Sequence, residues 1–393
     1  MNKSFFILFF LGLCLQVQCA VKTADNASST STFENEHEEV PNDIIANEID
    51  AGTPESMMSS NENQDAGVVE EGNQITTIDS GQASQTSDFE LCFADIDTPE
   101  FNGPDYDQFT PVIGSHCAGT QHQDFENIER VVFIGDSVTM GSPPTLSQDF
   151  YRNKLTQWLV THYGLQAPNS LWERYNVLDG HALIKNSGDF WNCSRWGART
   201  DDLMQDNGQI LDCFPQSERH KKTLVVLTIG GNDISNLTQN GYNRSYEQNK
   251  VQVENFVRLL RETIEWLKNS DNIPGGVQIV FGNMFEFTDG TGDISSCPAS
   301  SFAGFEDWED VTQLQDLVIW ANEQFLKIAV DTGSDMVFML EHFCGHGFTH
   351  EDPNGRCYRG PNTEQWFDLT CIHPNPAGHG ALADLFRDVI AGE

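Results

Sequence analysis

The stretch Arg130–Gly141, RVVFIGDSVTMG, decides the fold that the rest of the chain is expected to adopt. Within it, Val131–Ile134 form an apolar, β-branched run that stops at Gly135 and turns polar at Asp136 and Ser137. This pattern predicts a buried strand that delivers a serine to its carboxyl end. Open α/β sheets bind their ligands at the carboxyl ends of the strands, so we expect the chemistry at Ser137.

The segments on both sides of this stretch alternate between strand and helix patterns. Short β-branched runs predict strands at Thr223–Ile229, Val277–Phe281 and Met336–Leu340, and a short strand is conceivable at His181–Lys185. Apolar residues at helical spacing predict helices at Phe150–His162, Glu247–Lys268, Val311–Val330 and Ala377–Ile390. Strands that alternate with helices predict an α/β fold, a three-layer α/β/α domain around a mostly parallel, doubly wound sheet.

The amino-terminal residues 1–19 have the pattern of a secretory signal peptide. Lys3 is followed by the apolar run Phe5–Leu15, and Val17 and Cys19 suit the −3 and −1 positions of a cleavage site. The run has about eleven residues, whereas a membrane-spanning helix needs about twenty. We therefore expect a secreted protein without an integral membrane segment.

Residues 20–88 are rich in Ser, Thr, Asn and Glu and show no sustained period. Such a segment buries too little apolar surface to offset its chain entropy, which predicts a disordered acidic spacer. A propeptide is equally compatible with this composition. Globular composition begins near Phe89, and one domain is expected over residues 89–393.

Eight of the ten cysteines lie beyond the leader, and an even number in an exported protein favours disulfides. Pairing of sequence neighbours suggests Cys92 with Cys117, Cys193 with Cys213 and Cys344 with Cys357, which leaves Cys297 with Cys371. Glycosylation sequons begin at Asn26, Asn192, Asn236 and Asn243. In a host that glycosylates, a glycan on Asn192 would lie close to the mouth of the cleft.

The formal net charge of −38 is spread over the spacer and the globular part. An acidic surface repels phosphate backbones, so we expect no nucleic-acid partner. Neutral or cationic substrates fit this charge better.

Four motifs, in this order, resemble those of the SGNH, or GDSL-type, hydrolases of esters and lipids. They are Gly135-Asp136-Ser137, Gly197 ahead of a helix, Gly231-Asn232-Asp233 after a strand, and His373-Pro-Asn-Pro-Ala-Gly-His. The resemblance covers about residues 128–392 and implies the three-layer fold of that family. The chain lacks Gly-x-Ser-x-Gly at its serine, so the sharp nucleophile elbow of the α/β-hydrolases is not expected.

The chemistry places its own demands on these residues. A serine hydroxyl is a poor nucleophile without a base. His373, between a loop and the last helix, is the candidate base that would deprotonate Ser137. The backbone N–H groups of Ser137 and Gly197 and the side-chain amide of Asn232 are predicted to form the oxyanion hole. This reaction needs no cofactor.

Three histidines recur every four residues, His342, His346 and His350, and on a helix they would share one face and form a metal site. The glycines and Cys344 among them favour a loop instead of a helix, so we expect no metal site there. Trp191, Trp196 and Trp366 lie near the second and fourth motifs, where they would either floor a cleft or pack in the core.

The family resemblance and the chemistry favour a secreted serine ester hydrolase. Its substrate would be an acylated carbohydrate, a lipid or a simple ester, cleaved through an acyl-enzyme on Ser137. A phospholipase or lysophospholipase of the same fold is the first alternative. The second is a catalytically silent surface protein that binds carbohydrate.

The fourth motif departs from the family, which normally carries an aspartate three residues before the histidine. Thr370 occupies that position, and the nearest carboxylate, Asp368, lies five residues upstream of His373. Asp368 would reach the histidine Nδ1 only if the loop bulges, and a disulfide at Cys371 would pin such a bulge. We favour Asp368 as the residue that orients His373, and the alternative is a backbone carbonyl near Thr370.

Overall fold

The structure is a computed structural model that describes residues 117–205, 208–241, 243–301, 304–305 and 311–392. The predicted signal peptide, the spacer, Cys92 and the sequon at Asn26 lie outside the described residues. Everything below concerns the described part of the chain.

A six-stranded sheet forms the centre of the domain, in the order β2-β3-β1-β4-β5-β6. All neighbouring strands run parallel except β2 and β3, which are antiparallel. The strands are β1 (Arg130–Gly135), β2 (Asn186–Ser187), β3 (Phe190–Asn192), β4 (Thr223–Thr228), β5 (Val277–Gly282) and β6 (Asp335–Val337). Every residue of β1 and β4 is buried, as expected for strands covered on both faces.

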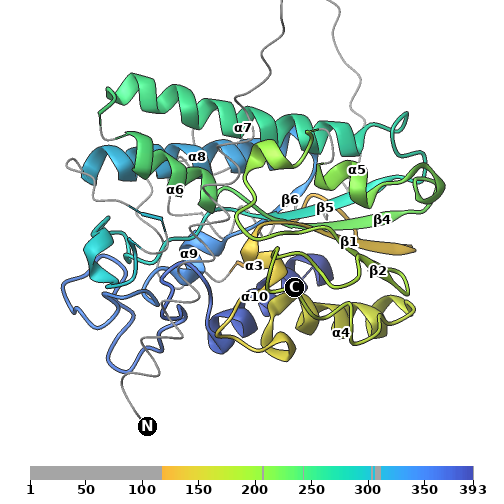
Figure 1. The fold of residues 1–393 in the computed structure, drawn as a ribbon, viewed down its shortest axis with the longest axis horizontal. Coiled ribbons are helices and arrows are strands. Elements are labelled where there is room, and N and C mark those ends of the chain that lie inside the picture. Colours follow the sequence, from red (N-terminus) through yellow and green to blue (C-terminus); the bar gives the residue numbers. More distant parts are fainter. Residues whose placement is uncertain (1–116, 206–207, 242, 302–303, 306–310, 393) are drawn as a thin grey trace, which may run out of the picture. The chain divides into compact units, whose positions relative to one another are not determined.

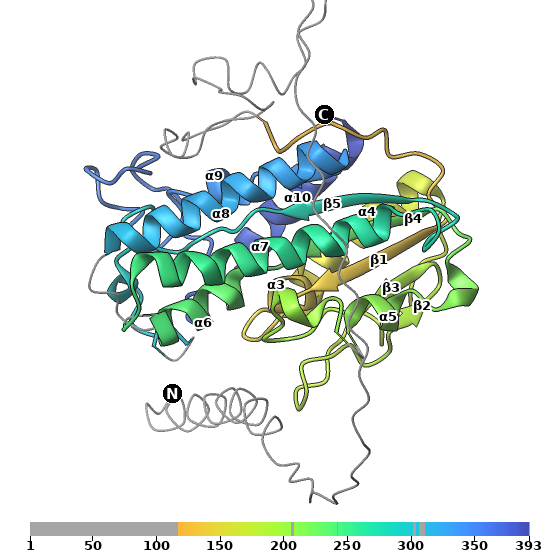
Figure 2. The same cartoon turned by 90° about the horizontal axis from the view of Figure 1, so that it is seen from above.

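Helices cover both faces of this sheet, which confirms the predicted three-layer α/β/α fold (Figure 1). One face carries α6 (Gly231–Gly241), α7 (Tyr246–Lys268) and α8 (Val311–Thr332), and α7 and α8 lie side by side in the view from above (Figure 2). The other face carries α4 (Tyr151–Tyr163), α9 (Met339–Phe343) and α10 (Pro376–Ala391). Two further short helices, α3 (Ser137–Met140) and α5 (Gln209–Cys213), contact β1. Single 3₁₀ turns occur at Ser147–Asp149, Thr200–Asp202, Gln216–Glu218 and Ile294–Ser296.

The connections change direction at β1. After β1 the chain forms β2 and β3 on one side of it, then crosses to β4 on the other side. A doubly wound sheet opens a crevice at such a switch point, beyond the carboxyl ends of the two strands. In the register of this pair Gly135 lies opposite Thr228, so β1 and β4 end level with each other.

Gly135 must be glycine for a geometric reason. Its φ is +122°, and a Cβ on it would lie 2.0 Å from the Thr228 carbonyl oxygen. Any side chain would therefore push β1 away from β4 at the point where the serine emerges.

Two predicted strands differ in the structure. The segment Met336–Leu340 was expected to be extended, but β6 ends at Val337 and α9 begins at Met339. The partner strand β5 ends at Gly282, which pairs with Val337, so the residues beyond have no ladder to join. The short strand expected at His181–Lys185 is reduced to two isolated bridges, His181 with Arg195 and Ala182 with Tyr175. The regular strands β2 and β3 follow it.

Three of the four predicted disulfides are present. Cys193–Cys213, Cys297–Cys371 and Cys344–Cys357 have Cα–Cα distances of 6.0, 5.9 and 5.3 Å. These separations are within the usual range for a disulfide. The fourth predicted pair includes Cys92, which lies outside the described residues.

Over the described ranges, no helix is both long and apolar enough to cross a membrane.

Candidate active site

Ser137 is the first residue of α3, directly after β1. Asp136 caps this helix, because its Oδ1 accepts hydrogen bonds from the Val138 N–H at 3.0 Å and from the Thr228 hydroxyl at 2.9 Å. Burial raises the pKa of Asp136 to about 6, against the lowering effect of the Thr228 and Val138 hydrogen bonds. The backbone N–H of Ser137 precedes the intrahelical hydrogen bonds, so it is free to donate to a ligand.

Gln209 holds the end of β1 from the opposite side. Its amide oxygen accepts from the Gly135 N–H at 2.6 Å, and its amide nitrogen donates to the Gly135 carbonyl at 2.8 Å. The Gln209 side chain thus bonds to both backbone groups of Gly135, as a neighbouring strand would. The turn that carries Ser137 is thus fixed by side chains from β4 and from α5.

His373 lies within hydrogen-bond distance of the serine, with its Nε2 2.8 Å from Ser137 Oγ. Burial lowers the pKa of His373 to about 4, so the imidazole is neutral at physiological pH. Its position follows from the start of α10, where the Asn375 side chain caps the helix and Pro376 occupies the first turn. The structure therefore brings together the predicted nucleophile and the predicted base, which are 236 residues apart in the chain.

The predicted hydrogen bond between the Asp368 carboxylate and His373 Nδ1 is absent. The atom next to His373 Nδ1 is Thr370 Oγ1, at 2.8 Å, and this hydroxyl donates to Asp368 Oδ1 at 2.5 Å. The alternative of a backbone carbonyl is also wrong, since a side-chain hydroxyl takes that place. The loop does bulge as expected: Cys371 adopts a φ of +71° and is bonded to Cys297.

Two of the three predicted oxyanion donors, Gly197 and Asn232, lie on two segments that are tied together. The Asn232 side chain donates one amide hydrogen to the Ala198 carbonyl at 2.9 Å, which leaves its second amide hydrogen for a ligand. The Asp233 carboxylate accepts from the backbone and hydroxyl of Thr200, at 3.1 and 2.9 Å. Burial raises the pKa of Asp233 to about 7.

Gly197 is exposed on the first of these segments, with a φ of +71°. A Cβ at this position would meet no atom within 4 Å. It is the positive φ, and not a lack of space, that favours glycine at this position. The open space leaves the backbone accessible to a ligand.

An apolar pocket opens beside Ser137 and Asn232, both of which line it. Most of its wall is aliphatic or aromatic and includes Ile234, Met284, Phe285, Phe287, Phe305 and Ile372. The three tryptophans named above are not among its lining residues. Trp196 instead donates to the Gly141 carbonyl at 2.8 Å, and the Trp366 ring stacks on His346.

The site thus combines a serine and a histidine in contact at the switch point, the Asn232 side-chain amide, and an apolar pocket. A family model of GDSL-like lipases and acylhydrolases matches residues 131–386, which include all of them. The chain belongs to the GDSL-like lipase/acylhydrolase family. It is accordingly a carboxylic ester hydrolase.

Solved structures of other GDSL-like and related hydrolases share similarity with this chain. An extracellular lipase from Streptomyces rimosus is 16% identical, with 66% of this chain and 99% of that chain covered and a TM-score of 0.41. A phospholipase A1 from Streptomyces albidoflavus is also 16% identical, with coverages of 66% and 99% and a TM-score of 0.39. An acetyl xylan esterase from Geobacillus stearothermophilus, in a single-substitution variant, is 16% identical, with coverages of 68% and 97% and a TM-score of 0.40. No curated protein matches the chain significantly.

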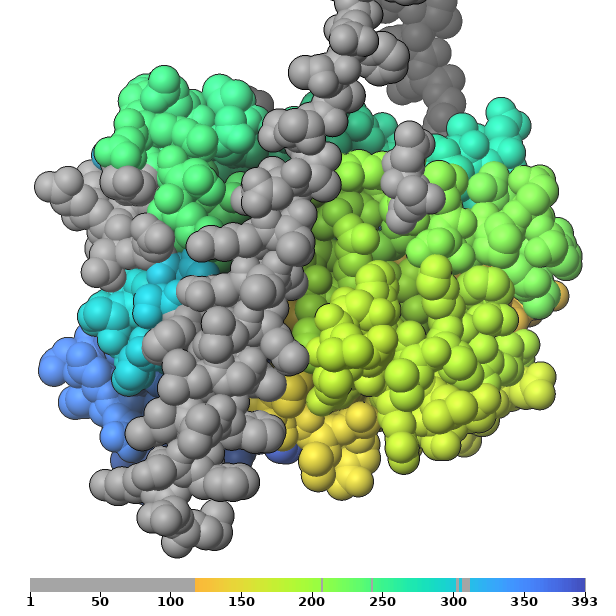
Figure 3. Space-filling model, in the orientation of Figure 1, coloured from red at the N-terminus to blue at the C-terminus, as the bar shows by residue number. Residues whose placement is uncertain are grey.

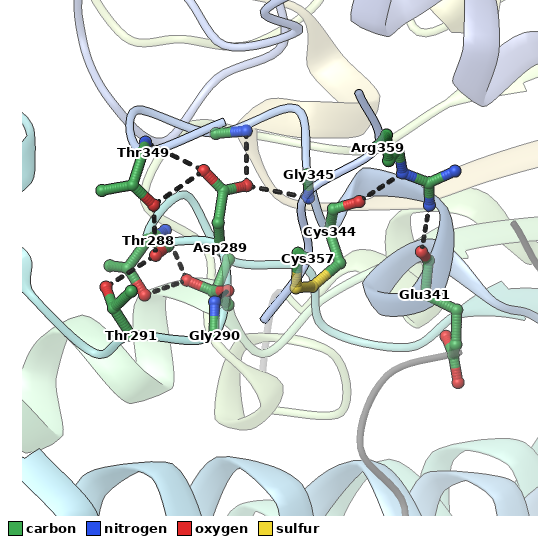
Figure 4. The surroundings of a disulfide bond; sticks show 12 residues. Thr288, Asp289, Gly290, Thr291, Glu341, Cys344, Gly345, Thr349, Cys357 and Arg359 are labelled. Carbon is green, nitrogen blue, oxygen red and sulfur yellow. Dashed lines mark hydrogen bonds between the residues drawn. A yellow bond between two sulfur atoms is a disulfide. The ribbon is translucent and has the colours of Figure 1, made fainter. Parts of the chain in front are cut away.

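Asp289 of this GDSL-like hydrolase accepts hydrogen bonds from the loop that follows α9 (Figure 4). Its Oδ1 accepts from the N–H groups of Gly345 and Gly347 at 2.9 and 2.7 Å, and its Oδ2 accepts from the Thr349 N–H at 2.9 Å. The Cys344–Cys357 disulfide and Arg359, which donates to the Cys344 carbonyl, hold the same loop (Figure 4). The segment that carries Phe285 and Phe287 is thus joined to a cross-linked loop. Sequence reasoning missed Asp289 because its partners lie more than fifty residues away.

His342, in α9, and His346 and His350, in the loop after it, do not converge. His342 Nε2 lies 2.9 Å from the Cys117 carbonyl, His346 Nδ1 2.6 Å from the Glu364 carbonyl, and His350 Nδ1 2.7 Å from the Gly347 carbonyl. One ring nitrogen of each histidine is therefore hydrogen-bonded to a different backbone carbonyl. Within the described residues, no three His, Cys, Asp or Glu side chains are grouped to hold a metal ion.

A glycan on Asn192 is incompatible with this structure. Asn192 is 1% exposed, and its Oδ1 accepts from the backbone and hydroxyl of Ser194 at 3.1 and 2.5 Å. The sequence pattern shows the acceptor tripeptide but not the burial of β3. Asn236 and Asn243 are exposed, so glycosylation at these two positions stays a prediction.

Proposed function

We propose that this hydrolase cleaves esters of apolar acyl chains longer than acetyl, through an acyl-enzyme on Ser137 with His373 as the base. The observation that carries the proposal is the apolar pocket directly beside a Ser137–His373 pair at 2.8 Å. A hydrocarbon chain gains about 0.8 kcal/mol for each CH₂ group that it buries. An acetyl group would leave most of such a wall without contacts.

In this mechanism the serine oxygen bonds to the ester carbonyl carbon while its proton passes to His373 Nε2. The negative charge that develops on the carbonyl oxygen is met by the Ser137 N–H, the Gly197 N–H and the free amide hydrogen of Asn232. The protonated Nε2 then gives its proton to the leaving alcohol oxygen. Water repeats the sequence and releases the acid.

A second observation supports an apolar substrate. The segment between α4 and β4, yellow-green in Figure 3, forms a continuous area of surface and exposes Leu171, Val177, Leu178 and Leu183, with Leu178 80% exposed. Trp196, in the same segment, packs against Gly180. Its indole N–H donates to the carbonyl of Gly141, four residues after Ser137. The exposed apolar side chains therefore belong to a loop that is fastened next to the serine turn.

The acyl preference is tested by narrowing the pocket with Val318→Phe. Val318 of α8 is half-buried and lines the pocket. We expect kcat/KM for a p-nitrophenyl octanoate to fall roughly tenfold or more, with less than a threefold change for the acetate, because only the longer chain needs the filled space. Val251→Phe is the matched control, since Val251 is exposed on the neighbouring helix α7. Equal losses on both esters would contradict acyl binding in this pocket.

We also propose that the protein is exported and that its leader is cleaved after Cys19. The support is the signal-peptide pattern of residues 1–19 and the three disulfides, which persist in oxidising compartments. Expression of the full chain in a secreting host should give a product in the medium whose amino terminus is Ala20. A cell-retained product that still begins at Met1 would overturn the proposal.

A further inference from the structure

We propose that Thr370 is the residue that sets the protonation of His373, as a neutral link between the imidazole and the carboxylate of Asp368. The inference rests on the proposed reaction at Ser137. It assigns positioning roles to both residues, because neither touches the serine or a substrate.

The contacts form one line of hydrogen bonds that ends at the serine. The Thr370 N–H and hydroxyl both donate to Asp368 Oδ1, at 2.7 and 2.5 Å. Thr370 Oγ1 lies 2.8 Å from His373 Nδ1, and His373 Nε2 lies 2.8 Å from Ser137 Oγ.

Counting protons along this line decides the tautomer. A threonine hydroxyl has one hydrogen, and an ionised carboxylate only accepts, so the hydrogen of Thr370 is committed to Asp368. The Thr370 oxygen then accepts from Nδ1–H. The one proton of the neutral imidazole is therefore on Nδ1, and Nε2 is free to accept the proton of Ser137.

Protonation of Asp368 reverses this arrangement. When the proton is on Oδ1, the oxygen that faces the Thr370 hydroxyl, the carboxylic acid donates to Thr370, which frees the threonine hydrogen to donate to Nδ1. The imidazole proton then sits on Nε2, where it faces the serine and blocks its deprotonation. The protonation state of Asp368 thus acts on the serine by setting the positions of two protons, the one on the Thr370 hydroxyl and the one on the His373 imidazole.

Among the described residues, the carboxylate of Asp368 accepts hydrogen bonds only from Thr370. Both of its hydrogen bonds come from Thr370, and its Oδ2 is buried without a hydrogen-bond partner among the described residues. A buried carboxylate oxygen left unpaired is costly, which is typical of functional sites. The loop is pinned around it, because the Asp368 N–H donates to the His373 carbonyl at 2.9 Å and Cys371 is bonded to Cys297.

The electrostatic surroundings allow this group to titrate near neutrality. Burial raises the pKa of Asp368 to about 6, opposed by the two Thr370 hydrogen bonds. His379 of α10 is the titratable neighbour of His373, and burial lowers its pKa to about 3, so it stays neutral. Activity should therefore be full from about pH 7 upward, half-maximal near pH 6, and lower still as Asp368 becomes protonated at more acidic pH.

The test compares Thr370→Val, Thr370→Ser and Asp368→Asn on a p-nitrophenyl ester. Thr370→Val keeps the shape but removes the hydroxyl, and we expect kcat to fall about 100-fold with KM within threefold. Thr370→Ser restores the hydroxyl and should stay within tenfold of the wild type. Thr363→Val is the matched control, because its hydroxyl donates only to the Gly360 carbonyl of the same loop region.

The pH profile separates this role from a structural one. The decrease of kcat/KM near pH 6 should vanish in Asp368→Asn, which has no acid to titrate, and in Thr370→Val, which cuts the link. The double variant Thr370→Val/Asp368→Asn should be no slower than Thr370→Val alone. If Thr370→Val does not fold, the profile of Asp368→Asn decides.

Three results would overturn the link: near-wild-type kcat in Thr370→Val, a pH 6 step that persists in either variant, or losses that multiply in the double variant. A failure of the proposed reaction looks different. In that case Ser137→Ala retains its hydrolysis, whereas a failed link leaves Ser137 essential.

Discussion

A Ser137→Ala variant is expected to lose ester hydrolysis by roughly 10⁴-fold or more in kcat. The hydroxyl removed is the one that lies 2.8 Å from His373 Nε2 at the carboxyl end of β1. Without it, the histidine has no nucleophile to deprotonate, and covalent labelling by a fluorophosphonate should disappear with the activity. Hydrolysis within tenfold of the wild type would show that another group attacks the ester.

The same variant should unfold within about 1 kcal/mol of the wild type. Ser137 is only 7% exposed, and its side chain loses one hydrogen bond in this variant. Such a bond contributes about 0.5–1.5 kcal/mol net. Ser142→Ala is the matched control, since its hydroxyl is buried five residues further along the chain and has no hydrogen-bond partner among the described residues. This variant should leave both activity and stability unchanged. Denaturant titration and ester assays on the two variants together separate a lost nucleophile from a lost fold.

Asn232→Ala should lower kcat by about 10²- to 10³-fold with a much smaller change in KM. The bond to the Ala198 carbonyl restrains the amide, so little reorganisation is needed before its second hydrogen donates to an oxyanion. A donor aimed at the oxyanion stabilises the transition state more than the bound ester, and that difference appears in kcat.

Asn236→Ala is the control for this substitution, one turn later on the same helix α6 and exposed. It should retain wild-type kcat and KM. A mainly KM effect at Asn232 would mean instead that the amide binds the substrate in its ground state. Thermal unfolding of both variants should be similar, because Asn232 is only half-buried.

The strands and helices of the sheet layers were predictable because each carries its own pattern. The apolar run of β4 and the 3.6-residue period of α7 depend only on which faces of these elements are buried. Burial of a face is visible in the pattern of apolar residues within each segment. The end of β6 was not predictable in this way. Whether Phe338 continues a strand depends on the length of β5, which is a different part of the chain.

The order of four short motifs was enough to indicate the family, since each sits at the end of a predicted strand or the start of a helix. Sequence alone could not show that Asn192, in an intact sequon, is buried. Nor could it show that Gln209 and Asp233 hold the serine turn and the Asn232 segment, because glutamine and aspartate are common in loops and their partners are distant.

The sequence by itself determined the α/β layers and the nucleophile and base candidates. It did not choose among the 105 possible disulfide connectivities, although pairing of neighbours suggested the three disulfides that the structure contains. Only the tertiary structure decided what touches His373 Nδ1. Counting residues from Asp368 shows that the loop must bulge, but the direction of each side chain follows from the positive φ of Cys371 and its bond to Cys297, 74 residues away. A backbone turn and a distant cross-link together place the Thr370 hydroxyl where the family places a carboxylate.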